Sequence, residues 1–432
     1  MPHQRPLTRL DQPQLDAMVR RHEMFRNARV GGARATLSFA DLSGLTLAGR
    51  DLAHADFTGA SLRGANLAGA RLDCAALFAA DLRQANLENA SLIKSDLRGA
   101  CLRGAILIGA NLFEADLRDG SLAEKDRAGN LHLIQVDGPM PAEASGADLS
   151  GADLTNARLS GAMAVHTDFT DAVMRGCKLV RATMRGANFS GSILEGADLS
   201  GADLSGACLR GAVLTGAALT MTTFDNADME DAMTDRPVGR TVDELDRPLE
   251  DLLRDHILWV GTGGAQGAAL DLSGFDLRSG PSLAHACLTM LRAVGVTLYG
   301  LDLTGAQMQA AVLEQADLRT VTLAGADLRG INLKNAKLNN ADLRNVNLRA
   351  LVFDETRRMP ANLSGARLRY ADFRGACLRN ADLTGADLSF ANLVGCDLAK
   401  ADLSHARLFG ARVERRALMN GVVLDGVAGL KL

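Results

Sequence analysis

A five-residue rhythm constrains this chain more than any other feature of its sequence. From residue 35 it reads ATLSF, ADLSG, LTLAG, RDLAH and ADFTG, and Leu or Phe stands at every fifth position from Leu37 to Leu122. The frame returns from Leu149 to Met229 and from Leu283 to Val423. A period of five fits neither the helix period of 3.6 nor the strand period of two. Fixed-period repetition instead predicts a solenoid, whose units bury their apolar residues by stacking on their neighbours.

Each unit has two positions that we expect to point inward: the central Leu or Phe and the residue two before it, which is usually Ala. Leu42 with Ala40 and Leu67 with Ala65 are examples. The remaining positions carry Asp, Asn, Arg, Ser, Thr and Gly and should face solvent. Gly at the unit end, as at Gly64, suits a corner because a tight turn needs permissive dihedral angles.

The units ADLSG, ANLAG, ADLRG and ADLTG resemble the pentapeptide repeat family, whose consensus is A-(D/N)-L-x-x, and the resemblance extends over most of the chain. It implies an all-β solenoid, a right-handed quadrilateral β-helix with four units per coil and, here, short capping helices. Coils of twenty residues would then stack at the inter-strand spacing of about 4.8 Å. Leu67, Leu87 and Leu107 should therefore lie in one column.

Two segments outside the repeat predict capping helices. Asp11 as N-cap and Pro13 in the first turn open a helix that runs to about Arg29. The segment from Thr241 to Glu244 resembles a capping box, and Asp246-Arg-Pro248 opens a second helix. Each helix would cover the open edge of the coil that follows it.

The two helical segments echo each other, because His22-x-x-Phe25 corresponds to His256-x-x-Trp259 and a glycine pair follows each. We interpret this as an internal duplication. The predicted parts are a tail and capping helix (1–34), a first β-helix (35–234) with an insertion at 123–146, a linker and second capping helix (235–268), and a second β-helix (269–432).

Composition narrows the class of function. The formal net charge is −4 over 432 residues, so neither nucleic-acid binding nor a strongly acidic surface is expected. Seven scattered Cys without a C-x-x-C motif favour a reducing compartment. The N-terminus has no apolar core typical of a signal peptide, and no apolar run reaches transmembrane length. We therefore expect a cytoplasmic protein that does not contact a membrane.

No constellation for chemistry is visible. The eight His are isolated, and neither H-E-x-x-H, G-x-S-x-G nor a Walker A motif occurs in its proper context. The many Asp stand at the outward consensus position, where hydrogen bonding between stacked units explains them better than acid–base work. We therefore expect no enzyme, no cofactor, no metal and no small-molecule substrate.

The predicted interaction surface consists of outward arginines and two insertions. With a twenty-residue coil, Arg63, Arg83 and Arg103 should stack, as should Arg329, Arg349 and Arg369. Such columns require either neighbouring carboxylates or an anionic partner. The insertion 123–146 is either a binding loop or a tolerated hairpin, and 354–360 is a local loop that bulges from one face and is also offered to a partner. The candidate residues are Arg63, Arg83, Arg103, Leu131, His132, Arg329, Arg349, Arg369, Arg357 and Arg358.

Three functions remain open. The first is an interaction scaffold for an unidentified protein partner. The second follows from the resemblance, because some family members mimic DNA and bind DNA gyrase. That alternative implies a strongly acidic rod with a C-terminal dimer element, from which this nearly neutral chain departs. The third is an enzyme with its site in the insertion 123–146 or in 234–268. The sequence specifies neither the partner nor the oligomeric state.

Overall fold

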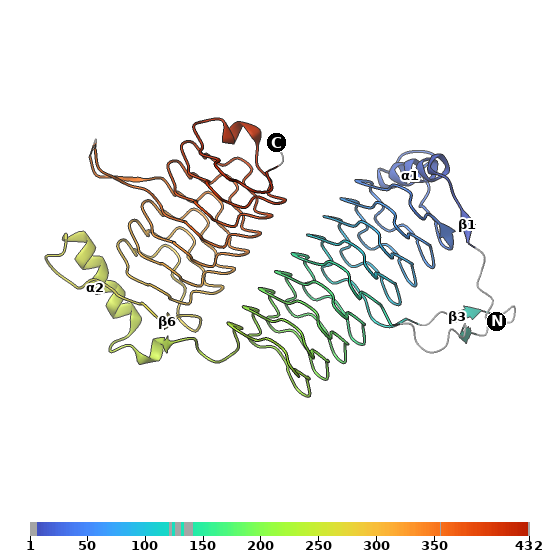
Figure 1. Cartoon of the computed structure of the whole chain (residues 1–432), viewed down its shortest axis with the longest axis horizontal. Coiled ribbons are helices and arrows are strands. Elements are labelled where there is room, and N and C mark those ends of the chain that lie inside the picture. The colour runs from blue at the N-terminus through green and yellow to red at the C-terminus, as the bar shows by residue number, and fades with distance from the viewer. Residues whose placement is uncertain (1–6, 121–122, 126–130, 134–140, 355, 431–432) are drawn as a thin grey trace. The chain divides into compact units, whose positions relative to one another are not determined.

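The computed structural model describes residues 7–120, 123–125, 131–133, 141–354 and 356–430 (Figure 1). The chain divides into two compact units, Met1–Arg236 and Pro237–Leu432. Each unit is a stack of coils with a helix near its N-terminal end, α1 in the first and α2 in the second. In the described part of the chain, neither helix is long and apolar enough to cross a membrane.

The regular coils take twenty residues each, as predicted. Parallel bridges join Asn66 to Asn86 and Asn86 to Ile106, and the amide of Leu67 donates to the carbonyl oxygen of Asn86 at 2.7 Å. Leu67, Leu87 and Leu107, which follow these bridges, therefore stand in one column and are fully buried. Each unit contributes one bridging residue before the chain turns, so the coils contain isolated bridges rather than long strands. The fold is a β-helix.

The inward and corner positions also agree with the sequence. Leu67 and Ala65 are fully buried. Cys177 and Cys396 occupy Ala positions and are also buried, with 0% and 7% of their surface exposed. Burial raises the pKa of the Cys396 thiol to about 12. The fifth residue of a unit adopts a positive φ, which is +60° at Gly64. This turn accounts for the frequency of Gly at the unit end.

Corner side chains of one coil cover the corner glycines of the next, and this predicts a difference between two glycines. A Cβ at Gly186 (φ +62°) would lie 2.4 Å from Nδ1 of His166, whereas a Cβ at Gly196 (φ +63°) would meet nothing within 4 Å. Gly196→Ala should cost about 1 kcal/mol for the left-handed backbone alone. Gly186→Ala should cost about 1 kcal/mol more, since the imidazole must move. Urea unfolding midpoints measure both, and equal losses would contradict the packing described.

The first unit begins with a short strand and a helix that close its first coil. β1 (Thr8–Arg9) pairs in parallel with β2 (Ala40–Asp41), so these two residues are ordered although the sequence suggested only a tail. α1 spans Gln12–Arg26. Asp11 is its N-cap: the Asp11 side chain accepts from the amide of Gln14, and the Gln14 side chain accepts from the amide of Asp11.

The second unit repeats this arrangement. β5 (Arg240–Thr241) pairs in parallel with β6 (Phe275–Asp276). The predicted capping box caps the 3₁₀-helix η1 (Val242–Glu244), and α2 follows at Leu249–Gly261.

A buried histidine joins each helix to its coil in the same way. Nδ1 of His22 accepts from the amide of Ala35, and Nε2 lies 3.1 Å from the carbonyl oxygen of Ala53. His256 makes the matching contacts with the amide of Leu270 and the carbonyl oxygen of Thr289.

Two insertions interrupt the coils. Glu143 bridges to Cys101, so the coil that contains the first insertion takes 42 residues instead of 20. It includes the hairpin of β3 (Ala123–Lys125) and β4 (Leu131–Leu133). The second consists of β7 (Leu351–Val352) and β8 (Arg358–Met359), which pair antiparallel. The 3₁₀-helix η2 (Arg415–Leu418) precedes the last described coil.

Candidate interaction surface

A group of eight outward arginines form ion pairs within their own five-residue repeats. In the pattern Asp-Leu-Arg, or Asp-Phe-Arg at Arg374, the aspartate and the arginine both point outward on either side of the buried Leu or Phe, and the guanidinium reaches back to the carboxylate. The nitrogen–oxygen distances lie between 2.5 and 2.7 Å. The arginines are Arg83, Arg98, Arg118, Arg278, Arg319, Arg329, Arg344 and Arg374. A unit with this pattern therefore adds no net charge to the surface.

The predicted column in the first unit exists and is matched by carboxylates. Arg83 binds Asp81 at 2.5 Å, Arg63 approaches the same Asp81 at 4.0 Å, and Arg103 binds Glu143 of the next coil at 2.6 Å. Burial works to raise the pKa of Asp81, but hydrogen bonds from Arg83 outweigh it and hold that pKa below its usual range. The column was expected to need either neighbouring carboxylates or an anionic partner, and the neighbouring carboxylates account for all three arginines.

The structure contradicts one residue of the arginine column that was predicted in the second unit. Asp327 bridges to Asn347 and Asn347 to Cys377, so Arg379 stands above Arg349. Arg369 belongs to another column, because Lys337 bridges to Arg367. The cause is the β7–β8 insertion, which lengthens that coil by ten residues. Arg329 pairs with Asp327, and Nε of Arg349 donates to the sulfur of Cys377 at 2.9 Å.

Two candidates, Leu131 and His132, lie in β4. Its backbone pairs with β3 in the register Glu124 with His132. The remainder of the predicted loop, at 126–130 and 134–140, lies outside the described residues. The candidate contact is therefore the second insertion.

The β7–β8 hairpin brings apolar and cationic side chains together outside the coils. It is the orange hairpin that projects from the second unit in Figure 1. Val352 and Phe353 are each 58% exposed and Met359 is 40% exposed. The predicted candidates Arg357 and Arg358 follow the turn, and both are exposed. Large apolar side chains with Arg are the composition of protein-binding hot spots.

An aspartate fixes the turn of this hairpin. Oδ1 of Asp354 accepts from the amides of Thr356 and Arg357 at 2.9 and 2.7 Å, and Oδ2 accepts from Nε of Arg357 at 2.5 Å. The Arg357 guanidinium, with these amides, lowers the pKa of Asp354 to about 2. The hairpin thus presents its apolar residues on a closed turn.

Sequence reasoning found the exposed arginines of the hairpin but missed its exposed apolar residues. Phe353 stands in phase with the repeat, ten residues before Leu363, so it reads as a buried centre. Both five-residue repeats between 351 and 360 leave the coil instead. Arg358 is the signal that could have revealed this, because it occupies the next central position, where a charged side chain cannot be buried.

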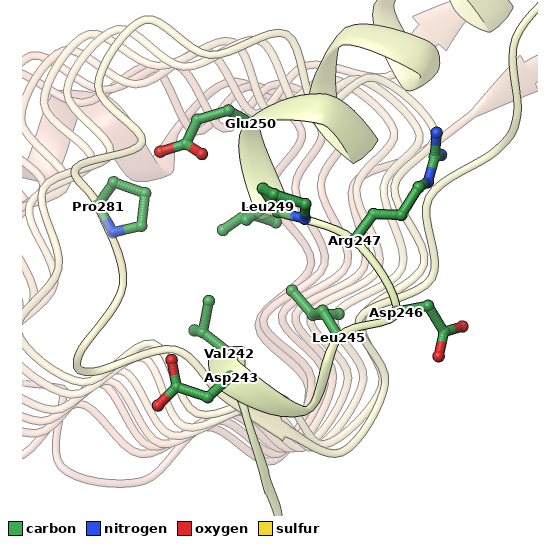
Figure 2. Close-up of a pocket in the computed structure, with 9 residues that line it drawn as sticks. Val242, Asp243, Leu245, Asp246, Arg247, Leu249, Glu250 and Pro281 are labelled. Carbon is green, nitrogen blue, oxygen red and sulfur yellow. The ribbon is translucent and has the colours of Figure 1, made fainter.

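A shallow pocket of about 340 Å³ lies beside the start of α2 (Figure 2). Val242, Leu245 and Leu249 turn toward it, while Arg247 turns away and pairs with Asp255 at 2.6 Å. The other lining residues are Asp243, Asp246, Pro248, Glu250 and Pro281. No histidine, cysteine or hydroxyl side chain lines it, so it is an apolar notch with acidic edges. Across the described residues, no three His, Cys, Asp or Glu are placed to hold a metal ion.

The family model for pentapeptide repeats matches this chain. The matched residues are 40–76, 70–107, 80–119, 142–171, 167–206, 192–231, 311–349, 361–385 and 376–415. Together they cover more than half of the chain, and they leave out both insertions and both helices. No curated protein sequence matches the chain.

Solved structures of pentapeptide repeat proteins are among those similar to this chain. A protein from the thylakoid lumen of Arabidopsis thaliana is 31% identical over 27% of this chain and 66% of its own, with a TM-score of 0.21. HetL from the cyanobacterium Nostoc, involved in regulating heterocyst differentiation, is 21% identical over 89% of this chain and 86% of its own, with a TM-score of 0.14. Full-length QnrB1, a plasmid-mediated fluoroquinolone resistance protein, is 18% identical over 61% of this chain and 91% of its own, with a TM-score of 0.21.

The family assignment rests on the sequence model and on the twenty-residue register rather than on these overall likenesses. The same five-residue unit that the model recognises is the one that forms a single corner of the coil. This chain therefore belongs to the pentapeptide repeat family.

Proposed function

We propose that this protein is a non-enzymatic scaffold that binds another protein, with the β7–β8 hairpin as its principal contact. The observation that supports this most is the exposure of Val352, Phe353 and Met359 beside two arginines on a closed turn. A solenoid does not need such a hairpin to bury its core, and the next coil resumes after it. An exposed aromatic side chain on a rigid projection is typical of an anchor that fills a pocket of the partner.

The register of the coils gives a clean test. Removing residues 351–360 joins Ala350 to Ala361 and restores the five-residue spacing between Leu348 and Leu363. We expect this deletion to fold with unchanged coils and to lose the partner. Phe353→Ser should weaken binding of that partner about tenfold or more, as loss of a hot-spot aromatic does. Capture from the native lysate identifies the partner, and titration with the purified partner gives the dissociation constants.

Lys334→Ser serves as the matched control. Lys334 is also exposed and also belongs to the second compact unit, but it lies on a regular coil. Its dissociation constant should stay within about twofold of the unaltered protein. If the deletion binds the same partner with an unchanged constant, the hairpin is not the contact. Circular dichroism of the deletion distinguishes that result from misfolding.

The remaining expectations stay proposals. We infer that the chain is a duplication of a capping helix and a β-helix, supported by the equal contacts of His22 and His256. A right-handed coil is expected from the family. The β3–β4 hairpin and the arginine columns are secondary candidates for the interface. All seven cysteines are unpaired, which supports a reducing, cytoplasmic compartment.

Gyrase binding by DNA mimicry is the alternative function. QnrB1 is a fluoroquinolone resistance protein by its description, but its low identity and TM-score give this chain no share in that role. A DNA mimic needs columns of carboxylates free to act as phosphates. The Asp-Leu-Arg units of this chain engage their aspartates in ion pairs, so the scaffold proposal is favoured.

A further inference from the structure

We infer that a second surface, on a regular face of the second unit, docks an acidic segment of a protein partner. The surface consists of Arg367, Arg369, Tyr370, Phe390, Arg407 and Phe409, and we refer to it as the arginine–aromatic face. The coil register assembles it, because Arg367 bridges to Asp387 and Asp387 bridges to Arg407. The inference builds on the scaffold proposal but uses residues outside the β7–β8 hairpin.

Two aromatic side chains of this face stack on each other, and arginines lie beside all three. The rings of Tyr370 and Phe390 stack with centroids 4.9 Å apart and an interplanar angle of 4°. The guanidinium carbon of Arg369 lies 5.9 and 6.0 Å from the centroids of these rings. That of Arg407 lies 5.8 Å from the ring of Phe409, which is 46% exposed. Ordered Arg and aromatic side chains lose little entropy when a partner binds.

The charge of this face differs from that of the other coils. The unit ARLRY at 366–370 carries arginine at both outward positions, so the usual aspartate is missing. Arg367 and Arg407 stand in one column with a single carboxylate between them, that of Asp387, which lies 4.0 Å from Nη1 of Arg407. Arg367 and Arg407 are exposed. A local surplus of positive charge on a chain of net charge −4 favours a negatively charged partner.

The ring geometry favours a protein segment over single-stranded nucleic acid. Nucleobases bind such surfaces by stacking on the faces of aromatic rings. Here the faces of Tyr370 and Phe390 cover each other, and Phe390 also lies over the next corner, where a Cβ on Gly410 would be 2.5 Å from its ring. Phe409, which is 46% exposed, is open to an apolar side chain, and the exposed guanidinium groups of Arg367 and Arg407 can each bind a carboxylate through two hydrogen bonds.

The spacing of the arginines suggests the pattern of the partner. Arg367 and Arg407 are two coils apart, which is about 10 Å at the usual inter-strand spacing. A polyproline II segment has three residues per turn and rises about 3.1 Å per residue, so residues three apart lie on one face, about 9 Å from each other. A segment in this conformation with acidic residues three apart and apolar residues between them would match the arginines and place an apolar side chain beside Phe409.

The test uses a fluorescein-labelled peptide of five Glu-Phe-Ser repeats, with fluorescence anisotropy at low salt. Arg367→Gln with Arg407→Gln should weaken binding at least tenfold. The control, Arg344→Gln with Arg374→Gln, removes the same charge from two arginines that pair with aspartates of their own units. It should change binding less than about twofold.

Equal losses in the two double variants would overturn the inference, because binding would then follow net charge alone. A fluorescein-labelled oligothymidylate that binds more tightly than the peptide, with the same dependence on Arg367 and Arg407, would overturn it in favour of nucleic acid. Phe353→Ser should leave peptide binding unchanged. A result that excludes the β7–β8 hairpin as a contact is therefore distinct from one that excludes the arginine–aromatic face.

Discussion

Leu204→Asp is expected to unfold the C-terminal coils of the first unit. Leu204 is fully buried, and its amide donates to the carbonyl oxygen of Thr223 in the next coil at 2.8 Å. Truncating a buried Leu already costs about 2–5 kcal/mol through the cavity it leaves. A carboxyl group without a partner in that cavity adds several kcal/mol, whether it is buried ionised or takes up a proton. We expect a total loss of at least about 5 kcal/mol.

The loss should be local at first, because each coil is stabilised mainly by its two neighbours. Amides between about 199 and 234 should lose hydrogen-exchange protection before those of the column Leu67, Leu87 and Leu107. Leu204→Met, which keeps the volume and the apolar character, should cost less than about 1.5 kcal/mol. A Leu204→Asp protein that melts with the unaltered protein and keeps its amide protection would contradict the inward assignment of this column.

The coil itself could be predicted from the sequence because each of its requirements is local and repeated. The small Ala, the central Leu and the permissive corner recur in every unit, so an error at one position is corrected by the others. The duplication was visible for the same reason, since His22 and His256 stand at equivalent places before equivalent coils. Their identical contacts with backbone groups explain why a histidine recurs there.

The interruption at 354–360 was visible in the sequence, but the start of the hairpin at 351–353 and the arginine–aromatic face could not be predicted in the same way. An insertion of ten residues leaves the phase of a five-residue repeat unchanged, so Phe353 reads as core and Arg369 is assigned to the wrong column. The strand β1 escaped notice because two residues carry no periodic signal, and its order comes from pairing with β2. The Arg–Asp pairs, in contrast, follow directly from the Asp-Leu-Arg pattern once both residues are placed on the outer face.

Acid is expected to loosen the caps of both units through His22 and His256. The amides of Ala35 and Leu270 can only donate, so Nδ1 of each ring must be unprotonated, and Nε2–H then donates to the carbonyl oxygen of Ala53 or Thr289. A protonated ring would direct a second N–H at an amide N–H. Burial lowers the pKa of both imidazoles below 6.5, although the backbone bond to Nε2 opposes this.

The sign of the effect follows from where the proton binds. An unfolded histidine takes up a proton as the pH falls below about 6.5, whereas the folded one does so only at its lower pKa, so the free energy of unfolding decreases over that interval. Between pH 6.5 and pH 5 the decrease is at most about 2 kcal/mol for each histidine. The pKa of His22 is also shifted by the charges of Asp51, Arg26 and Arg34, whereas burial and the backbone bond alone shift the pKa of His256. Denaturant midpoints from pH 7.5 to pH 5 measure the effect.

Glutamine at both positions separates the histidines from every other titrating group. Its side chain can accept from the amide and donate to the carbonyl oxygen without titrating, so His22→Gln with His256→Gln should keep the caps and flatten the pH dependence between 6.5 and 5. The aspartates cannot imitate this, because the pKa values of those paired with arginine are lowered and they titrate below that range. A double variant whose stability falls with pH as steeply as that of the unaltered protein would show that the caps do not sense acid through these rings.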